Sequence, residues 1–183
     1  MIRNLLYLCT LSLLLGSCKS PEARRPIQSK SGSFIQESVV RNKKILEEDQ
    51  QQIKQLMASD SSKQYYASES GFWYYYQVKD TVSGLRPKLG DAVSFTYLVE
   101  TLNGNTVLSE EENGLQYYKI DQTNQELISG IRDGLKLMQV GEQVTFLFPS
   151  YKAYGYYGID DKLGTNIPVR CTVNLLSLNI QEN

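Results

Sequence analysis

Two kinds of hydrophobic periodicity divide the chain. Between residues 34 and 58, apolar residues recur three, four and seven positions apart among Glu, Lys and Gln, which predicts one amphipathic helix. From Gly71 onward, apolar and polar residues alternate in short runs, as in strands that bury one face. The clearest runs cover residues 72–78, 92–102, 106–109, 117–120, 144–148 and 169–180.

The apolar stripe of the predicted helix 34–58 consists of Ile35, Val39, Leu46, Ile53 and Leu56. Val39, Leu46 and Ile53 are seven residues apart, which would suit a coiled coil. Asn42 and Asp49 interrupt the stripe at the same spacing. We therefore expect this helix to pack against its own domain or a partner rather than against a second copy.

One further helix is predicted among the strands. Its apolar face consists of Leu127, Ile128, Ile131, Leu135 and Met138. Thr123 and Glu126 have capping-box spacing, so the helix should begin near Asn124 and end at Val140-Gly141. Strands dominate around this one helix, which predicts an α+β domain with an antiparallel sheet packed on it.

Turn signals separate the predicted strands. Asn103-Gly104 predicts a hairpin, and Pro149 should end the strand 144–148 because proline has no amide hydrogen for the ladder. The run Glu110–Glu112 predicts an exposed loop. A hydrolase that uses these carboxylates is the weaker alternative, because adjacent like charges repel and favour solvation.

The first 33 residues differ in composition from the rest. Residues 1–17 place Arg3 before a short apolar run, which is typical of a secretory signal peptide and too short to span a bilayer. The segment ends in Leu15-Gly16-Ser17-Cys18, which resembles a lipoprotein cleavage motif whose cysteine becomes lipidated. The alternative is an ordinary signal with a chance cysteine. Residues 18–33 are rich in Pro and Ser and predict a flexible tether.

Composition excludes several classes of function. Lys and Arg total 19 against 20 Asp and Glu, so no basic excess points to nucleic acid. The chain has no histidine, which excludes Ser-His-Asp and Cys-His nucleophilic sites and any histidine metal site. We expect no cofactor and no metal. Cys171 lies in an apolar strand, as a small core residue does, and no disulfide framework is implied.

The segment from Gly130 to Gly155 carries a resemblance. It contains a glycine-bearing helix, then Met138-Gln-Val-Gly-Glu142, an apolar strand, a proline, and Ala153-Tyr154-Gly155. This order resembles the FKBP-type peptidyl-prolyl isomerases, and the match extends over roughly residues 71–180. The resemblance implies a curved sheet around a short helix, in a domain spanning residues 68–183. It also implies prolyl isomerisation of proline-containing polypeptide clients.

The resemblance further implies which residues form the site. Tyr154 would donate a hydrogen bond to a substrate carbonyl, the backbone amide of Ile128 would donate another, and Tyr97 would line the pocket. The remaining lining positions fall on Leu108, Tyr118, Leu127, Ile131 and Cys171. For the three tyrosines, the alternative is that they are half-buried sheet aromatics of a chain that contains 13 tyrosines.

Several positions depart from the family pattern. Leu108-Ser109 replaces a Phe-Asp pair, Ile131 replaces a tryptophan, and Cys171 replaces a phenylalanine. The pocket is therefore less aromatic and lacks its carboxylate, and we expect weakened catalysis. A non-catalytic chaperone or assembly module of an envelope complex is the competing interpretation.

The front of the chain is similar to lipoprotein members of this family from gliding Bacteroidetes. That similarity implies a lipid anchor on Cys18 and a role in gliding motility, next to envelope motility or secretion machinery. No acidic run follows Cys18, so the expected location is the periplasmic side of the cell envelope.

Overall fold

The computed structural model describes residues 31–80, 84–122 and 127–180. The chain forms two compact units, residues 1–37 and 38–183. The first unit is described only for residues 31–37, which begin helix α2 (Ser31–Ser59). The predicted signal peptide 1–17 and residues 18–30 of the predicted tether 18–33 lie outside the described residues, whereas residues 31–33 of that tether are helical and begin α2. Among the described helices, none combines the length and the apolar character that a bilayer span requires.

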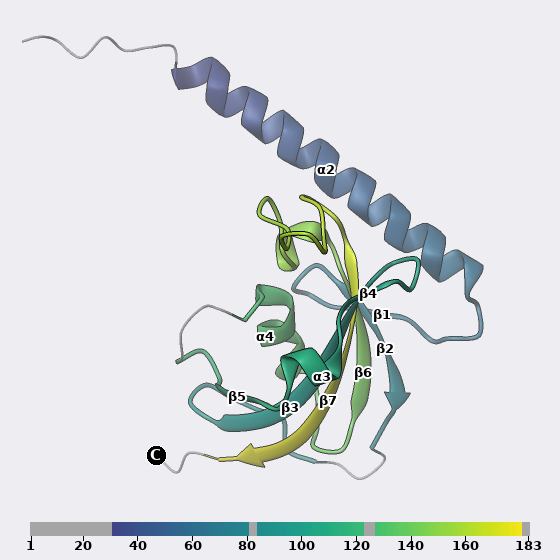
Figure 1. The fold of residues 1–183 in the computed structure, drawn as a ribbon, viewed down its shortest axis with the longest axis vertical. Helices are drawn as coiled ribbons and strands as arrows, with labels where there is room; N and C mark the ends of the chain where they lie inside the picture. The colour runs from purple at the N-terminus through teal and green to yellow at the C-terminus, as the bar shows by residue number, and fades with distance from the viewer. Residues whose placement is uncertain (1–30, 81–83, 123–126, 181–183) are drawn as a thin grey trace, which may run out of the picture. The chain divides into compact units, whose positions relative to one another are not determined.

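A single antiparallel sheet forms the body of the second unit. Its strands are β1 (Tyr66–Ala67), β2 (Trp73–Val78), β3 (Ala92–Thr101), β4 (Thr106–Leu108), β5 (Gln116–Lys119), β6 (Gln143–Phe148) and β7 (Val169–Asn179). The spatial order is β1-β2-β6-β7-β3-β4, and β5 also pairs with β3. The sheet curves past the short helix α4 (Figure 1). The predicted α+β class is thus confirmed.

Helix α4 (Ser129–Leu135) is shorter than the sequence predicts. Ile128 has an extended backbone with ψ 143° and is its N-cap, so Leu127 and Ile128 precede the helix. After Leu135 the chain tightens into turns, in which the amide of Leu137 donates to the carbonyl of Gly134. The predicted helical range was therefore wrong at both ends. Its capping pair, Thr123 and Glu126, lies outside the described residues.

Helix α4 packs unusually close to β6 because two of its residues are glycines. A Cβ on Gly130 would lie 2.7 Å from the ring of Phe148, and one on Gly134 would lie 2.8 Å from the ring of Phe146. The helix backbone therefore rests directly on two aromatic rings. Ile131 and Leu135 are fully buried beside these contacts.

The Glu110–Glu112 run is not a loop. It forms helix α3 (Glu110–Asn113), whose N-cap is Ser109. The Ser109 hydroxyl accepts a hydrogen bond from the amide of Glu112, and the Glu112 carboxylate accepts one from the amide of Ser109. The three carboxylates lie in the first helical turn, where the positive end of the helix dipole favours them. The expected loop was therefore wrong.

The turn signals agree with the structure elsewhere. Gly104 adopts a φ of +91° in the β3–β4 hairpin. Strand β6 ends at Phe148, and Pro149 is the N-cap of the 3-10 helix η1 (Ser150–Lys152). The segment after this proline is the one that carries Tyr154.

Helix α2 includes the whole range 34–58 that the periodicity predicts. Its stripe is buried unequally, since Ile53 is fully buried whereas Val39 is 60% exposed. The half of the helix that follows Asn42 therefore supplies the buried residues.

Candidate functional site

Tyr154 lies in the loop that follows η1, against the apolar core of the sheet. Its side chain is partly buried, and burial raises the pKa of its hydroxyl far above the usual value, with smaller contributions from Tyr97 and Cys171. The hydroxyl therefore keeps its proton at neutral pH and can donate a hydrogen bond. Within residues 31–80, 84–122 and 127–180, no group is hydrogen-bonded to it.

Tyr97 of β3 and Cys171 of β7 lie close enough to Tyr154 to interact electrostatically with it. Burial also raises the pKa of Tyr97, with Cys171 as the second cause, and it raises the pKa of the Cys171 thiol. All three groups are therefore neutral at physiological pH. The candidate site is an apolar region with uncharged polar tips.

The eight expected site residues fall into two layers around one core cluster. Five are partly exposed and can contact a bound polypeptide: Tyr97, Leu108, Leu127, Ile128 and Tyr154. Three are buried: Tyr118, Ile131 and Cys171. All eight belong to the hydrophobic core of the domain or pack against it, from β3, β4, β5, β7, α4 with the two residues before it, and the loop after η1.

The three buried residues cannot contact a bound polypeptide directly. Ile131 and Cys171 have no exposed surface. Tyr118 is 6% exposed, and its hydroxyl accepts a hydrogen bond from the amide of Asp121. This contact gives Tyr118 a local structural role as well.

Ile128 lies at the start of α4. It is the N-cap of α4, and its carbonyl accepts the hydrogen bond from the amide of Arg132 that opens the helix. Amides at the start of a helix have no acceptor within the helix. The Ile128 amide therefore has no acceptor within α4.

Ser109 replaces the expected pocket aspartate, and the structure gives it a different task. Its side chain caps α3, and its neighbour Leu108 ends β4. The capping interaction explains why a serine is useful here. It also leaves the apolar cluster without a carboxylate at this position.

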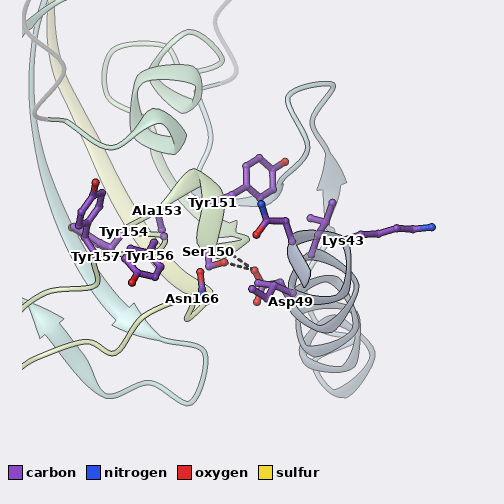
Figure 2. Close-up of a pocket in the computed structure, with 13 residues that line it drawn as sticks. Lys43, Asp49, Ser150, Tyr151, Ala153, Tyr154, Tyr156, Tyr157 and Asn166 are labelled. Atoms are coloured by element: carbon purple, nitrogen blue, oxygen red, sulfur yellow. Dashed lines mark hydrogen bonds between the residues drawn. The ribbon is translucent and has the colours of Figure 1, made fainter. Parts of the chain in front are cut away.

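A groove of about 690 Å³ runs between α2 and the loop that carries Tyr154 (Figure 2). The helix contributes Asn42, Lys43, Ile45, Leu46 and Asp49, and the loop side includes Ala153, Tyr154, Tyr156 and Tyr157. Tyr154 thus belongs both to the core cluster and to this groove. Tyr156 and Tyr157 are 75% and 88% exposed at its edge.

Sequence reasoning missed Asp49. It appeared only as a polar interruption of the α2 stripe, yet its carboxylate is 2% exposed and accepts two hydrogen bonds from Ser150. A charged residue at an apolar position of an amphipathic helix was the available signal. Its partner is 101 residues away, so the sequence alone could not identify it.

The sequence profile of the FKBP-type peptidyl-prolyl cis-trans isomerase family matches residues 84–176. This range covers just over half of the 183 residues, and it contains β3 to β6, α4, most of β7 and the site described above. The chain therefore belongs to the FKBP-type peptidyl-prolyl cis-trans isomerase family.

One curated relative is the probable FKBP-type peptidyl-prolyl cis-trans isomerase FkpA of Neisseria meningitidis serogroup B. It is 28% identical to this chain over 108 residues. The aligned region covers 59% of this chain and 39% of the relative, so the chain corresponds to well under half of that protein.

Two solved structures share the fold. A peptidyl-prolyl cis-trans isomerase from Pseudomonas syringae pv. tomato has a TM-score of 0.58 at 19% identity, over 75% of this chain and 96% of that one. FkpA from Escherichia coli has a TM-score of 0.57 at 18% identity, over 97% of this chain and 82% of that one. At such identities the likeness shows the fold alone, and the FKBP-like architecture expected from the sequence is confirmed.

Proposed function

We propose that this chain catalyses the cis–trans isomerisation of X-Pro peptide bonds in polypeptide clients. The planar amide resists rotation by about 18–20 kcal/mol because rotation breaks its resonance. At the twisted transition state the carbonyl is less polarised than in the planar amide. An apolar site favours this state over the solvated ground state, so no nucleophile and no cofactor are needed. The absence of histidine fits this chemistry.

The described residues supply the parts that this reaction needs. The partly exposed apolar residues Leu108, Leu127 and Ile128 offer a surface for the proline ring. The Ile128 amide and the Tyr154 hydroxyl offer two donors for the carbonyl groups that flank the twisting bond. Tyr97 lines the site next to Tyr154 and is neutral.

The Tyr154 hydroxyl carries this proposal, because it is a protonated donor at an apolar cluster and has no partner among the described residues. Tyr154→Phe is expected to lower kcat/KM on a proline-containing peptide about two- to tenfold, the net worth of one hydrogen bond. A protease-coupled isomerisation assay measures this. Tyr151→Phe, on the neighbouring exposed tyrosine, is the matched control and should leave kcat/KM unchanged. Equal rates for wild type and Tyr154→Phe would contradict the assigned role.

The second candidate function is a non-catalytic binding module of an envelope complex. The aliphatic Ile131 and the small Cys171 beneath the site favour it, since they leave the cluster less aromatic than the family pattern. In this case the purified chain would leave proline exchange at its spontaneous rate while still suppressing the aggregation of an unfolded client. The isomerisation assay therefore separates the two functions.

For the cellular role, we propose a lipoprotein anchored through Cys18 on the periplasmic side of the envelope. There it assists the folding of exported proteins, including components of gliding or secretion machinery. The motif Leu15-Gly16-Ser17-Cys18 and the Pro- and Ser-rich segment that follows it support this proposal. Two or more acyl chains hold a protein on a membrane stably where one is marginal.

Replacing Cys18 with alanine in the native cell is expected to move the protein from the membrane fraction to the soluble fraction. Radiolabelled fatty acid should label the wild type and not the variant.

If the role in motility is correct, colonies of a deletion strain should spread less, and the wild-type gene should restore spreading. Unchanged membrane association in Cys18→Ala would contradict the anchor, and normal spreading of the deletion strain would contradict the motility role.

A further inference from the structure

We infer that Asp49 of α2 is a positioning residue for Tyr154, so that the helix outside the family domain takes part in building its site. One oxygen of the carboxylate, Oδ2, accepts hydrogen bonds from the Ser150 amide at 2.8 Å and from the Ser150 hydroxyl at 2.6 Å (Figure 2). Both Asp49 and Ser150 are 2% exposed. The inference rests on the proposed function for its effect on catalysis.

Ser150 is also hydrogen-bonded, through its carbonyl, to the backbone on both sides of Tyr154. Its carbonyl accepts hydrogen bonds from the Ala153 amide at 3.0 Å and from the Gly155 amide at 2.9 Å. These two residues flank Tyr154 directly. The α2 carboxylate is therefore two hydrogen bonds away from each peptide that sets the direction of the Tyr154 side chain.

The position of Asp49 is costly, which separates it from an incidental surface contact. Burial raises the pKa of Asp49 despite the two hydrogen bonds from Ser150, and Glu48 adds a smaller rise. An apolar residue on this stripe, like Ile53 one turn further on, would avoid the desolvation cost. This carboxylate accepts both hydrogen bonds from one residue and so ties the loop to the helix at Ser150.

The Ser150 amide also lacks an acceptor within its own helix, η1. Its predecessor, Pro149, makes no side-chain capping bond to η1. Amides in the first turn of a helix have no internal acceptor. Asp49 supplies that acceptor from α2, so the conformation of the Tyr154 loop depends on the helix being in place.

Two substitutions break the link at different points. Asp49→Ala removes both hydrogen bonds, and Ser150→Ala removes only the one from the hydroxyl. Displacing a group that binds the transition state lowers the rate, and Asp49 acts through the Tyr154 hydroxyl. Asp49→Ala should therefore lower kcat/KM about two- to tenfold, by no more than Tyr154→Phe does. Ser150→Ala should have a smaller effect, and Asp49→Asn should recover most of the rate because its amide oxygen can still accept.

A double substitution tests whether Asp49 acts through Tyr154. In a Tyr154→Phe background there is no hydroxyl to misplace, so adding Asp49→Ala should change kcat/KM far less than it does in the wild type. If the fold-loss of kcat/KM in the double variant equals the product of the two single losses, the two residues act independently and the inference is overturned.

The control for general destabilisation is Thr145→Val. It removes a buried hydroxyl that is hydrogen-bonded to Thr172 at 2.9 Å, on the face of β6 opposite the core ring of Phe146. Its kcat/KM should match the wild type even if its melting temperature falls as far as that of Asp49→Ala. An equal loss of rate in Thr145→Val would reduce the role of Asp49 to stability alone.

Hydrogen exchange tests the positioning without relying on catalysis. In Asp49→Ala, the exchange rates of the Ala153 and Gly155 amides should rise above their wild-type values by a larger factor than those of the β7 amides. In Thr145→Val, the exchange rates of these two amides should rise by no larger a factor than those of the sheet amides. If the wild type shows no isomerase activity but these amides respond as stated, the proposed function fails and the link stands. Unchanged protection of both amides in Asp49→Ala would overturn the link itself.

Discussion

Phe146→Ala is expected to lower the free energy of unfolding by about 3–5 kcal/mol, a large part of the roughly 5–15 kcal/mol that holds a domain together. Phe146 is fully buried in the central strand β6. Its ring stacks on Phe148 at 5.4 Å between centroids and meets the edge of Phe72 at 5.7 Å. Gly134 of α4 lies directly against it, so truncation also removes the support of the helix.

Urea unfolding followed by circular dichroism measures this loss. Phe146→Leu is the matched control, because it keeps most of the apolar volume and should lose less than half as much. A loss below about 1 kcal/mol for Phe146→Ala would mean that the core collapses around the cavity and that α4 does not depend on this ring.

Gly158→Ala should destabilise the loop that holds Tyr154 more than any other single methyl addition in that loop. Gly158 has a φ of +64°, and an added Cβ would lie 2.3 Å from the carbonyl oxygen of Leu163. Its amide also donates to the carbonyl of Tyr154. Backbone strain and the clash each cost about 1–3 kcal/mol, so we expect a combined loss of about 2–6 kcal/mol together with reduced kcat/KM.

Gly114→Ala isolates the backbone term of that prediction. Gly114 has a nearly identical φ of +61°, and an added Cβ there meets nothing within 4 Å. Its ψ of −168° places it in a backbone region that is essentially restricted to glycine, so its substitution should cost this backbone strain alone, about 1–3 kcal/mol. Thermal unfolding and the isomerisation assay compare the two variants. Equal losses would show that the Leu163 carbonyl moves aside and that the loop is less constrained than its contacts indicate.

Local sequence signals predicted the strands well, because alternation follows directly from which side chains face the core. Strands β3 and β6 lie within one residue of their predicted limits. The hairpin at Gly104 and the stop at Pro149 depend on backbone constraints of single residues, and these are also readable from sequence.

The helices were predicted less accurately for physical reasons. Apolar spacing extended the predicted helix to Leu127 and Met138, yet both pack on the core from non-helical segments. Charge repulsion argued against a helix at Glu110–Glu112. The capping pair of Ser109 and Glu112 outweighed it, and that pair was visible in the sequence.

The candidate site was readable only through the family motif. Nothing in the alternation of β3 distinguishes Tyr97 from an ordinary sheet tyrosine, and Tyr118 does have an ordinary structural contact. The link from Asp49 to Ser150 joins residues of different elements through tertiary packing. Such a pair leaves no local pattern, so its two partners could be matched only in the folded chain.

Because Cys171 is completely buried, its reaction with a thiol reagent can report opening of the folded sheet. Only the thiolate reacts readily with alkylating reagents, and here the thiol is both inaccessible and held in its protonated form. It is the only cysteine after Cys18, and β7 pairs it with both β3 and β6 at the centre of the sheet. In a chain that begins after Cys18, the rate of thiol labelling would therefore report how often the whole sheet opens, without any added probe.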